Sequence, residues 1–173
     1  MPDGPVFPSA RPAIRVAVLT ISDAGARGER ADSSGDSIVA WVAERGLALA
    51  VRSLVPDETV AIVRALSSWA DGGEVDLIIT TGGTGLTPRD ITPEATRAVL
   101  DRDAPGIAEA IRMEALARFP RAALSRGLAG VRGRTLIVNL PGSPGGVADG
   151  LAVLARWVEH AVALVRGERS DHA

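Results

Sequence analysis

Four short aliphatic runs, separated by segments with apolar residues at helical spacing, constrain the fold more than any other feature. The runs span residues 14–22, 47–55, 75–81 and 135–140. The composition of the run 14–22 predicts a buried strand, the alternation of 47–55 predicts a second strand, and 75–81 and 135–140 are the third and fourth predicted strands. Strands that alternate with helices predict an α/β fold whose largely parallel sheet is covered by helices on both faces. In such a sheet, ligands bind beyond the carboxyl ends of the strands.

Cap residues and helical spacing predict the helices between these strands. Ser33 with Asp36 three residues later fits a capping box, and Thr92 followed by Pro93 is a favourable helix start. The predicted helices open at Ser33, Asp57 and Thr92, with a further helix over residues 104–119 and one long final helix over residues 147–165. This arrangement places four loops at one edge of the sheet, namely 22–33, 56–58, 82–92 and 141–146.

The length of the chain suits a single domain, because 173 residues can bury a sizeable core. Residues 14–167 form the predicted domain, and residues 1–13 and 168–173 are expected to be loose tails. No segment reaches the ~18 consecutive apolar residues that predict a membrane span. The first residues carry four prolines and early charge, which does not match a secretory signal.

The composition excludes several kinds of site. The chain has no cysteine, so disulfides and thiolate metal sites are impossible, and we expect a reducing, cytoplasmic location. All 19 basic residues are arginine, which excludes a Schiff-base lysine and a Walker lysine. The only histidines, His160 and His172, lie near the end of the chain, so a histidine-based triad or metal site is not expected. A net charge of −2 disfavours nucleic acid as a partner.

Glycine-rich loops follow two of the predicted strands. TTGGTGLTPRDITPEAT (80–96) contains Gly82, Gly83 and Gly85, and NLPGSPGG (139–146) also lies between a strand and a helix. Backbone N–H groups of such loops can surround an anion, because glycine permits close approach and the following helix start adds partial positive charge. Two such loops at one sheet edge could hold two phosphate-bearing groups. The alternative is a pair of ordinary strand-to-helix turns.

Acidic side chains near these loops are candidates for binding magnesium. Asp57 in VPDE and Asp90 in TPRD both follow strands, and Mg²⁺ commonly takes one or two carboxylates together with substrate phosphates. The alternatives are a helix cap for Asp57 and an Asx turn for Asp90. Arg89 could pair with a phosphate or lie in solvent, and Asp23 could serve only in a turn.

Four hydroxyl side chains complete the candidate set: Ser22, Thr84, Ser125 and Ser143. Each of them alone is typical of local hydrogen bonding. Together with the glycine loops and the acids, they gather most of the unusual residues of the chain near one predicted edge of the sheet.

The order of the motifs resembles one known family. LTISD, DSSGD, VPDE, TTGGTGLTPRDITPEAT, LSRGLAGVRG and LIVNLPGSPGGV occur here in the order seen in the molybdopterin-binding (MogA/MoaB-like) family, over about residues 14–167. The string from GGTG to TPEAT is highly specific, and the flanking motifs are moderately so. The resemblance implies a three-layer αβα sandwich with a mostly parallel central sheet, and usually a homotrimer. It also implies an activity, since adenylyltransferase members transfer AMP from Mg·ATP to the terminal phosphate of molybdopterin and release pyrophosphate.

Carried over residue by residue, the resemblance implies two catalytic, metal-associated carboxylates, Asp57 and Asp90. It implies phosphate contacts from Gly82, Gly83, Thr84 and Gly85, and parts of the pterin and nucleotide sites at Ser125, Asn139, Pro141, Gly142 and Ser143. Ser22, Asp23 and Arg89 join the candidate substrate- and nucleotide-binding residues. The expected cofactor is Mg²⁺, the expected substrates are ATP and molybdopterin, and a downstream molybdenum-insertion protein is a candidate partner.

Other readings of the resemblance stay open. Gly145 and Gly146 follow Pro144 and offer no side chains, so any ligand contact there must come from the backbone. Pro144 itself resembles the adenylyltransferase branch more than the MoaB branch. The alternatives are a non-catalytic molybdopterin-binding carrier (MoaB-like) in the same pathway and a nucleotide-dependent enzyme with an unrelated anionic substrate. The intact pair Asp57 and Asp90 favours a catalyst, because a carrier does not require it.

Overall fold

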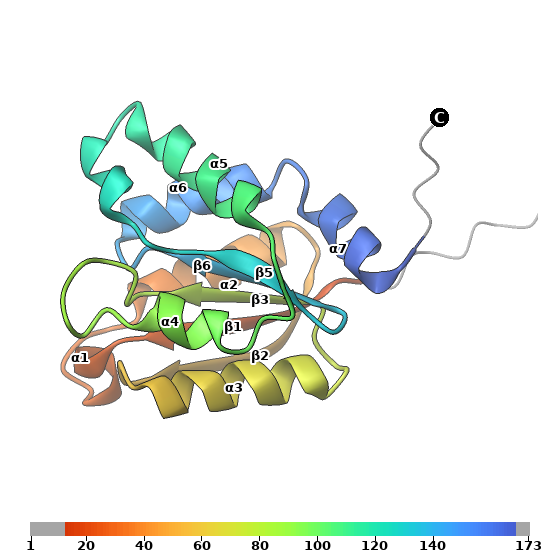
Figure 1. Cartoon of the computed structure of the whole chain (residues 1–173), viewed down its shortest axis with the longest axis horizontal. Helices are drawn as coiled ribbons and strands as arrows, with labels where there is room; N and C mark the ends of the chain where they lie inside the picture. Colours follow the sequence, from red (N-terminus) through yellow and green to blue (C-terminus); the bar gives the residue numbers. More distant parts are fainter. Residues whose placement is uncertain (1–12, 169–173) are drawn as a thin grey trace, which may run out of the picture.

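The computed structural model describes residues 13–168 and shows one six-stranded sheet between two layers of helices (Figure 1). The sheet order is β2-β1-β3-β6-β5-β4. The strands are β1 Arg15–Ile21, β2 Ala48–Val55, β3 Leu77–Thr81, β4 Arg102–Asp103, β5 Ala129–Arg132 and β6 Thr135–Leu140. Strands β2, β1, β3 and β6 run parallel, whereas β5 and β4 are antiparallel to their neighbours. The predicted α/β fold with a mostly parallel sheet is confirmed, and the predicted tails lie almost wholly outside the described residues.

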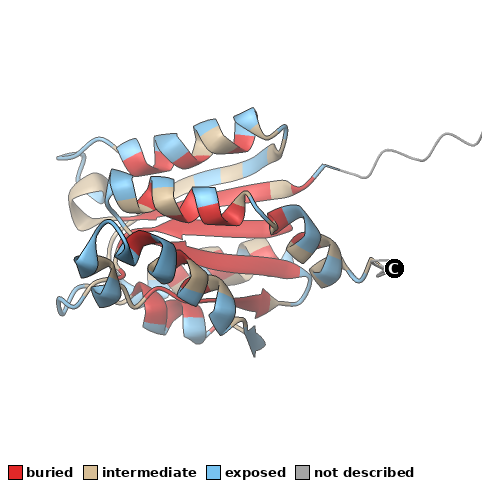
Figure 2. Ribbon diagram, turned by 90° about the horizontal axis from the view of Figure 1, so that it is seen from above, coloured by how far each residue is buried: buried red, intermediate tan, exposed pale blue. Residues whose placement is uncertain are grey.

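Alternating strand residues divide the core between the two faces of the sheet. In β1, Val16 and Val18 belong to one buried cluster and Ala17 and Leu19 to the other. The first cluster is covered by α2 (Ser33–Glu44), α5 (Pro105–Leu116), α6 (Pro144–Leu154) and α7 (Val158–Arg166). The second is covered by α3 (Thr59–Asp71) and α4 (Thr92–Arg97). Figure 2 shows the buried strands between helices whose outer faces are exposed, as period-2 strands between amphipathic helices require.

Two parts of the element pattern differ from the prediction. The antiparallel strands β4 and β5 were not expected, because they are only two and four residues long and carry no aliphatic run. The long final helix is divided into α6 and α7 around Trp157, which adopts φ −154 and ψ 0. No Gly or Pro marks this break, so composition alone predicts one continuous helix.

The predicted helix caps are also wrong in three places. Helix α2 is capped by Asp32, whose carboxylate accepts a hydrogen bond from Gly35 N, and not by Ser33. The cap position of α3 is Glu58 and that of α4 is Ile91, neither of which makes a side-chain cap hydrogen bond. The side chains of Asp57 and Thr92 therefore do not cap these helices, which differs from the predicted cap at Thr92 and from the alternative role of Asp57.

The order of the strands creates a crevice at one edge of the sheet. Strand β1 lies between β2 and β3, so the chain leaves it toward one side and later returns on the other. Ligands of open α/β sheets bind at such a switch point, beyond the carboxyl ends of the strands. The short helices α1 (Asp23–Ala26) and η1 (Pro120–Leu124) and the four predicted loops complete this part of the molecule. Within residues 13–168, no helix has both the length and the apolar character needed to cross a membrane.

Candidate active site

A cleft with two lobes lies at the carboxyl ends of β1, β3 and β6. The first lobe has a volume of about 350 Å³ and includes Ser22 and Asp57 in its lining. The second lobe, of about 620 Å³, lies between the glycine loop, α5 and η1. Four residues belong to the lining of both lobes: Gly83, Asp90, Gly142 and Ser143. A group bound in one lobe would therefore meet a group bound in the other at these residues.

The glycine loop is held in a shape that other residues rarely adopt. Gly82 has φ +99 and Gly83 has φ +64, both in the left-handed region. A Cβ at Gly82 would lie 2.2 Å from the carbonyl oxygen of Ile21, and one at Gly83 would lie 2.3 Å from Thr92 Oγ1. The Thr92 hydroxyl donates to Gly82 O at 2.9 Å, and Thr92 N donates to Gly83 O at 3.1 Å. The glycines thus bring the backbone of the loop against the strand ends and the start of α4.

Asp57 is held by a reciprocal contact with the loop after β1. Its carboxylate accepts a hydrogen bond from Asp23 N at 2.8 Å, and Asp57 N donates to the Asp23 carboxylate at 3.0 Å. Burial raises the pKa of the Asp57 carboxyl above its usual value, although the Asp23 amide and the charge of Arg89 oppose that shift. Asp57 is a partly buried carboxylate that lines a cleft, which is a common property of functional acids.

Asp23 and Arg89 support Asp57 instead of lining the cleft. The Arg89 guanidinium donates two hydrogen bonds of 2.9 Å to the Asp23 carboxylate, and this contact holds the pKa of Asp23 below its usual range. Neither residue is part of the lining of either lobe. Arg89 therefore forms an ion pair at the surface, where its side chain is 60% exposed, and it does not line the space for a phosphate.

Asp90 closes its own turn and faces both lobes. Its carboxylate accepts a hydrogen bond from Thr87 N at 2.8 Å, and Asp90 N donates to Thr87 O at 3.0 Å. A Cβ at Gly85 would lie 2.9 Å from the Asp90 carboxylate, and one at Gly83 would lie 3.0 Å from that of Asp57. The two acids consequently flank the glycine loop, as the sequence predicted.

The donor set of the cleft fits magnesium bound together with a ligand. Among residues 13–168, no group of three or more His, Cys, Asp or Glu side chains could hold a metal ion by itself. Asp57 and Asp90 supply two carboxylates beside a glycine loop, and Mg²⁺ commonly takes its remaining ligands from substrate phosphates and water. A site of this kind would be completed only by a phosphate-bearing substrate.

The remaining candidates divide into residues that line the cleft and one that does not. Ser22, Gly82, Thr84, Gly85, Ser125 and Pro141 join the four shared residues in the lining. Asn139 is buried, and its amide bonds Thr80, Thr96 and the backbone of Leu128. The prediction of a direct ligand contact by Asn139 is not supported, because these internal partners use its polar atoms.

Several lining residues were missed by sequence reasoning. The arginines are Arg30 in the first lobe and Arg112 and Arg121 in the second. They stand outside the glycine motifs, and no spacing rule distinguishes them from the many other arginines. The start of α6 was the more predictable element, since Ser143 caps it by accepting from Gly146 N at 3.2 Å and its first turn borders the second lobe. An open helix start of this kind favours an anion.

Comparison with known proteins decides the family. A family model described as a probable molybdopterin binding domain matches residues 17–160. The chain belongs to this family. The resemblance found in the motifs is thereby confirmed.

Relatives within the molybdopterin-binding family include bacterial proteins of similar length. The molybdopterin adenylyltransferase of Helicobacter pylori strain J99 is 39% identical over 89% of this chain and 89% of its own length. The crystal structure of the molybdopterin biosynthesis enzyme MoaB from Thermus thermophilus has 52% identity and a TM-score of 0.84, covering 89% of this chain and 97% of that one. The molybdenum cofactor synthesis protein cinnamon of Drosophila melanogaster is 40% identical over 92% of this chain. The chain spans only 28% of the length of cinnamon.

Proposed function

We propose that this protein is a molybdopterin adenylyltransferase, which transfers AMP from Mg·ATP to the terminal phosphate of molybdopterin. The observation that carries the proposal is the meeting of both lobes at Gly83, Asp90, Gly142 and Ser143. A transferase that joins two phosphate-bearing molecules requires two such spaces with one common boundary. The name of the Helicobacter relative supports the same activity.

In the proposed reaction, a terminal phosphate oxygen of molybdopterin attacks the α-phosphorus of ATP. A new P–O bond forms, the bond from the α-phosphorus to the bridging oxygen breaks, and pyrophosphate leaves with that electron pair. Such a transfer depends mainly on positioning and charge neutralisation. Neither a cysteine nor a lysine nucleophile is needed, and this chain has neither.

The residues of the cleft have separate tasks in this proposal. Asp57 and Asp90 would hold Mg²⁺, which when bound neutralises part of the charge on the phosphates. The backbone of the glycine loop and the start of α6 bind and orient the phosphates through N–H groups. Three arginines in the lining, Arg30, Arg112 and Arg121, add positive charge for two anionic substrates.

The proposal extends to the setting of the reaction. We expect a homotrimer, which light scattering would detect as a particle of three times the 17.8 kDa chain mass. The adenylylated product needs a consumer, and a molybdenum-insertion protein is the proposed downstream partner. The use of ATP supports a cytoplasmic location.

The direct test is incubation of the protein with molybdopterin, ATP and Mg²⁺, followed by measurement of pyrophosphate. The proposal predicts pyrophosphate release that depends on molybdopterin and Mg²⁺ and that falls about two to three powers of ten in Asp90→Asn. Tight molybdopterin binding without pyrophosphate release would instead support a non-catalytic carrier and would contradict the proposed activity.

A further inference from the structure

Arg126, which lies just before β5, makes three contacts with the loop that carries Asp90. Its side chain donates from Nε to Gly85 O at 2.7 Å and from Nη2 to Asp90 O at 2.5 Å. Its backbone N donates to Thr84 O at 2.8 Å. One residue from a distant part of the chain therefore bonds the loop at both ends of the 85–90 segment.

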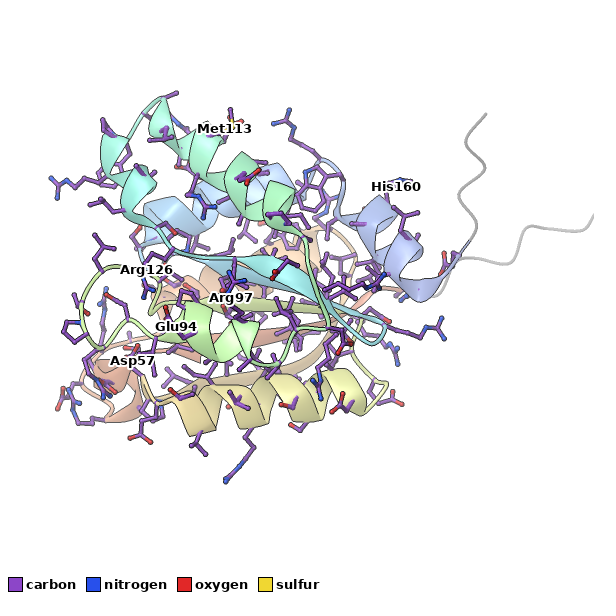
Figure 3. The ribbon with its side chains drawn as sticks, viewed as in Figure 1. Asp57, Glu94, Arg97, Met113, Arg126 and His160 are labelled. Carbon is purple, nitrogen blue, oxygen red and sulfur yellow. The ribbon has the colours of Figure 1, made fainter. Side chains whose placement is uncertain are left out.

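The guanidinium is oriented by an acid on the first turn of α4. Arg126 Nη1 forms an ion pair with the Glu94 carboxylate, and Nη2 lies 3.4 Å from its second oxygen. Figure 3 shows Arg126 and Glu94 side by side, on the same side of the molecule as Asp57 and far from His160. Because arginine presents five donors on a rigid plane, it can serve two carbonyls and one carboxylate at once, which a lysine ammonium cannot do in the same geometry.

Arg126 also links the loop to the second lobe. It directly follows Ser125, and Leu124 and Ser125 both line that lobe. Arg126 itself is absent from the lining of both lobes. It is thus placed to fix residues that face the cleft without touching a ligand.

We propose that Arg126 is a positioning residue for Asp90, holding the 84–90 backbone so that the Asp90 carboxylate is directed to the boundary between the lobes. The inference rests on the proposed function, in which Asp90 shares Mg²⁺ with substrate phosphates. Thr87 N fixes the carboxylate from within the loop, and Arg126 fixes the loop itself. Loss of the guanidinium should therefore weaken magnesium use more than it weakens the fold.

The test compares Arg126→Lys and Arg126→Met with Arg97→Met. Arg97 is a suitable control because it lies on α4, as Glu94 does, and forms an exposed ion pair with Asp103 of β4. Its hydrogen bonds are to Asp103 and not to the loop. We expect both Arg126 variants to need at least tenfold more Mg²⁺ for half-maximal ATP binding and turnover, with kcat largely recovered at saturating Mg²⁺. Millimolar guanidinium should restore Arg126→Met in part, and the control should match the wild type.

Hydrogen exchange of the peptide covering residues 84–91 gives a second readout that needs no turnover. The proposal predicts faster exchange of this peptide in both Arg126 variants, with little change in the strands. Faster exchange with unchanged Mg²⁺ dependence would show that the Arg126 hydrogen bonds only stabilise the loop. Unchanged exchange would show that they do not hold the loop at all. Either result would overturn the inference. A wild type that binds Mg·ATP but transfers no AMP would overturn the proposed function, while the Mg²⁺ dependence of ATP binding would still decide the role of Arg126.

Discussion

At the scale of single residues, the two carboxylates of the cleft are held in different ways. The Asp57 carboxylate accepts a hydrogen bond from the backbone N–H of Asp23, at the start of α1, whereas the Asp90 carboxylate accepts one from the backbone N–H of Thr87 within its own turn. Burial raises the pKa of Asp57, so its ionised form carries a cost that a neutral side chain would avoid. An acid retained where burial disfavours its charged form points to a role outside stability.

Asp57→Asn should therefore remove activity without harming the fold. The amide oxygen can still accept the hydrogen bond from Asp23 N, and the partly buried negative charge is removed. We expect a melting temperature equal to or slightly above that of the wild type, with AMP transfer lowered by about two to three powers of ten. Scanning calorimetry and the pyrophosphate assay on one preparation measure both. A clearly lower melting temperature with activity retained in the folded fraction would return Asp57 to a structural role.

Arg89→Gln tests the electrostatic support of Asp57 through its pH dependence. A nearby cation favours the ionised carboxylate, so removing Arg89 should raise the pKa of Asp57 further. Because metal binding requires the ionised form, the acid limb of the kcat/KM profile should move to higher pH. Arg97→Gln, with an exposed pair elsewhere, serves as the control. An acid limb that stays in place or moves to lower pH would contradict this account.

At the scale of elements, the aliphatic runs predicted the four parallel strands, and the motifs predicted which loops form the cleft. Local sequence could not give the short strands β4 and β5, since their pairing depends on neighbours far along the chain. It also could not show that Arg89 turns to Asp23 or that Asn139 turns inward. Those contacts are set by tertiary packing, and each residue type is compatible with either orientation.

The glycine loop offers a matched pair of substitutions at this scale. Gly83→Ala should lower the free energy of unfolding by at least ~1 kcal/mol, because φ is +64 and the new Cβ would meet Thr92 Oγ1 at 2.3 Å. Gly85 has no positive φ, and the nearest group to its Cβ would be the Asp90 carboxylate, at 2.9 Å. Gly85→Ala should thus keep the fold but raise the Mg²⁺ requirement.

Chemical denaturation and Mg²⁺ titration separate these effects. The account fails at this point if Gly83→Ala is as stable as the wild type, or if Gly85→Ala destabilises the fold while Mg²⁺ dependence is unchanged.

At the scale of the whole molecule, a cluster of charged residues links β1, β3 and α7 near the amino-terminal ends of the strands, opposite the cleft. Asp76, which is 4% exposed and precedes β3, accepts hydrogen bonds from Arg15 at the start of β1 and from Arg166 at the end of α7. Burial alone would raise the pKa of Asp76, but the two arginines reverse this and hold it well below its usual range. Stability from this carboxylate is therefore present above the unfolded-state pKa of ~3.9 and is lost as the pH falls below that value.

Asp76→Asn should destabilise the protein without changing the chemistry of the cleft. Removing one partner of a buried ion pair leaves the arginines without their shared acid, and we expect a loss of about 3 kcal/mol at pH 7. The difference from the wild type should shrink as the pH is lowered through 4 in denaturation experiments. Stability equal to that of the wild type at pH 7 would contradict the structural role of Asp76. A lower kcat of the folded variant would contradict the independence of the cleft from this ion cluster.

The most direct measurement of the central claim follows the α-phosphate of ATP. With ATP labelled at that position, molybdopterin and Mg²⁺, the wild type should place one label on each molybdopterin for each pyrophosphate released. Asp57→Asn and Asp90→Asn should do so at least a hundredfold more slowly, and Arg97→Met should match the wild type. Label that never reaches molybdopterin would contradict the proposed reaction. Transfer by the two aspartate variants at the wild-type rate would contradict the role of these carboxylates.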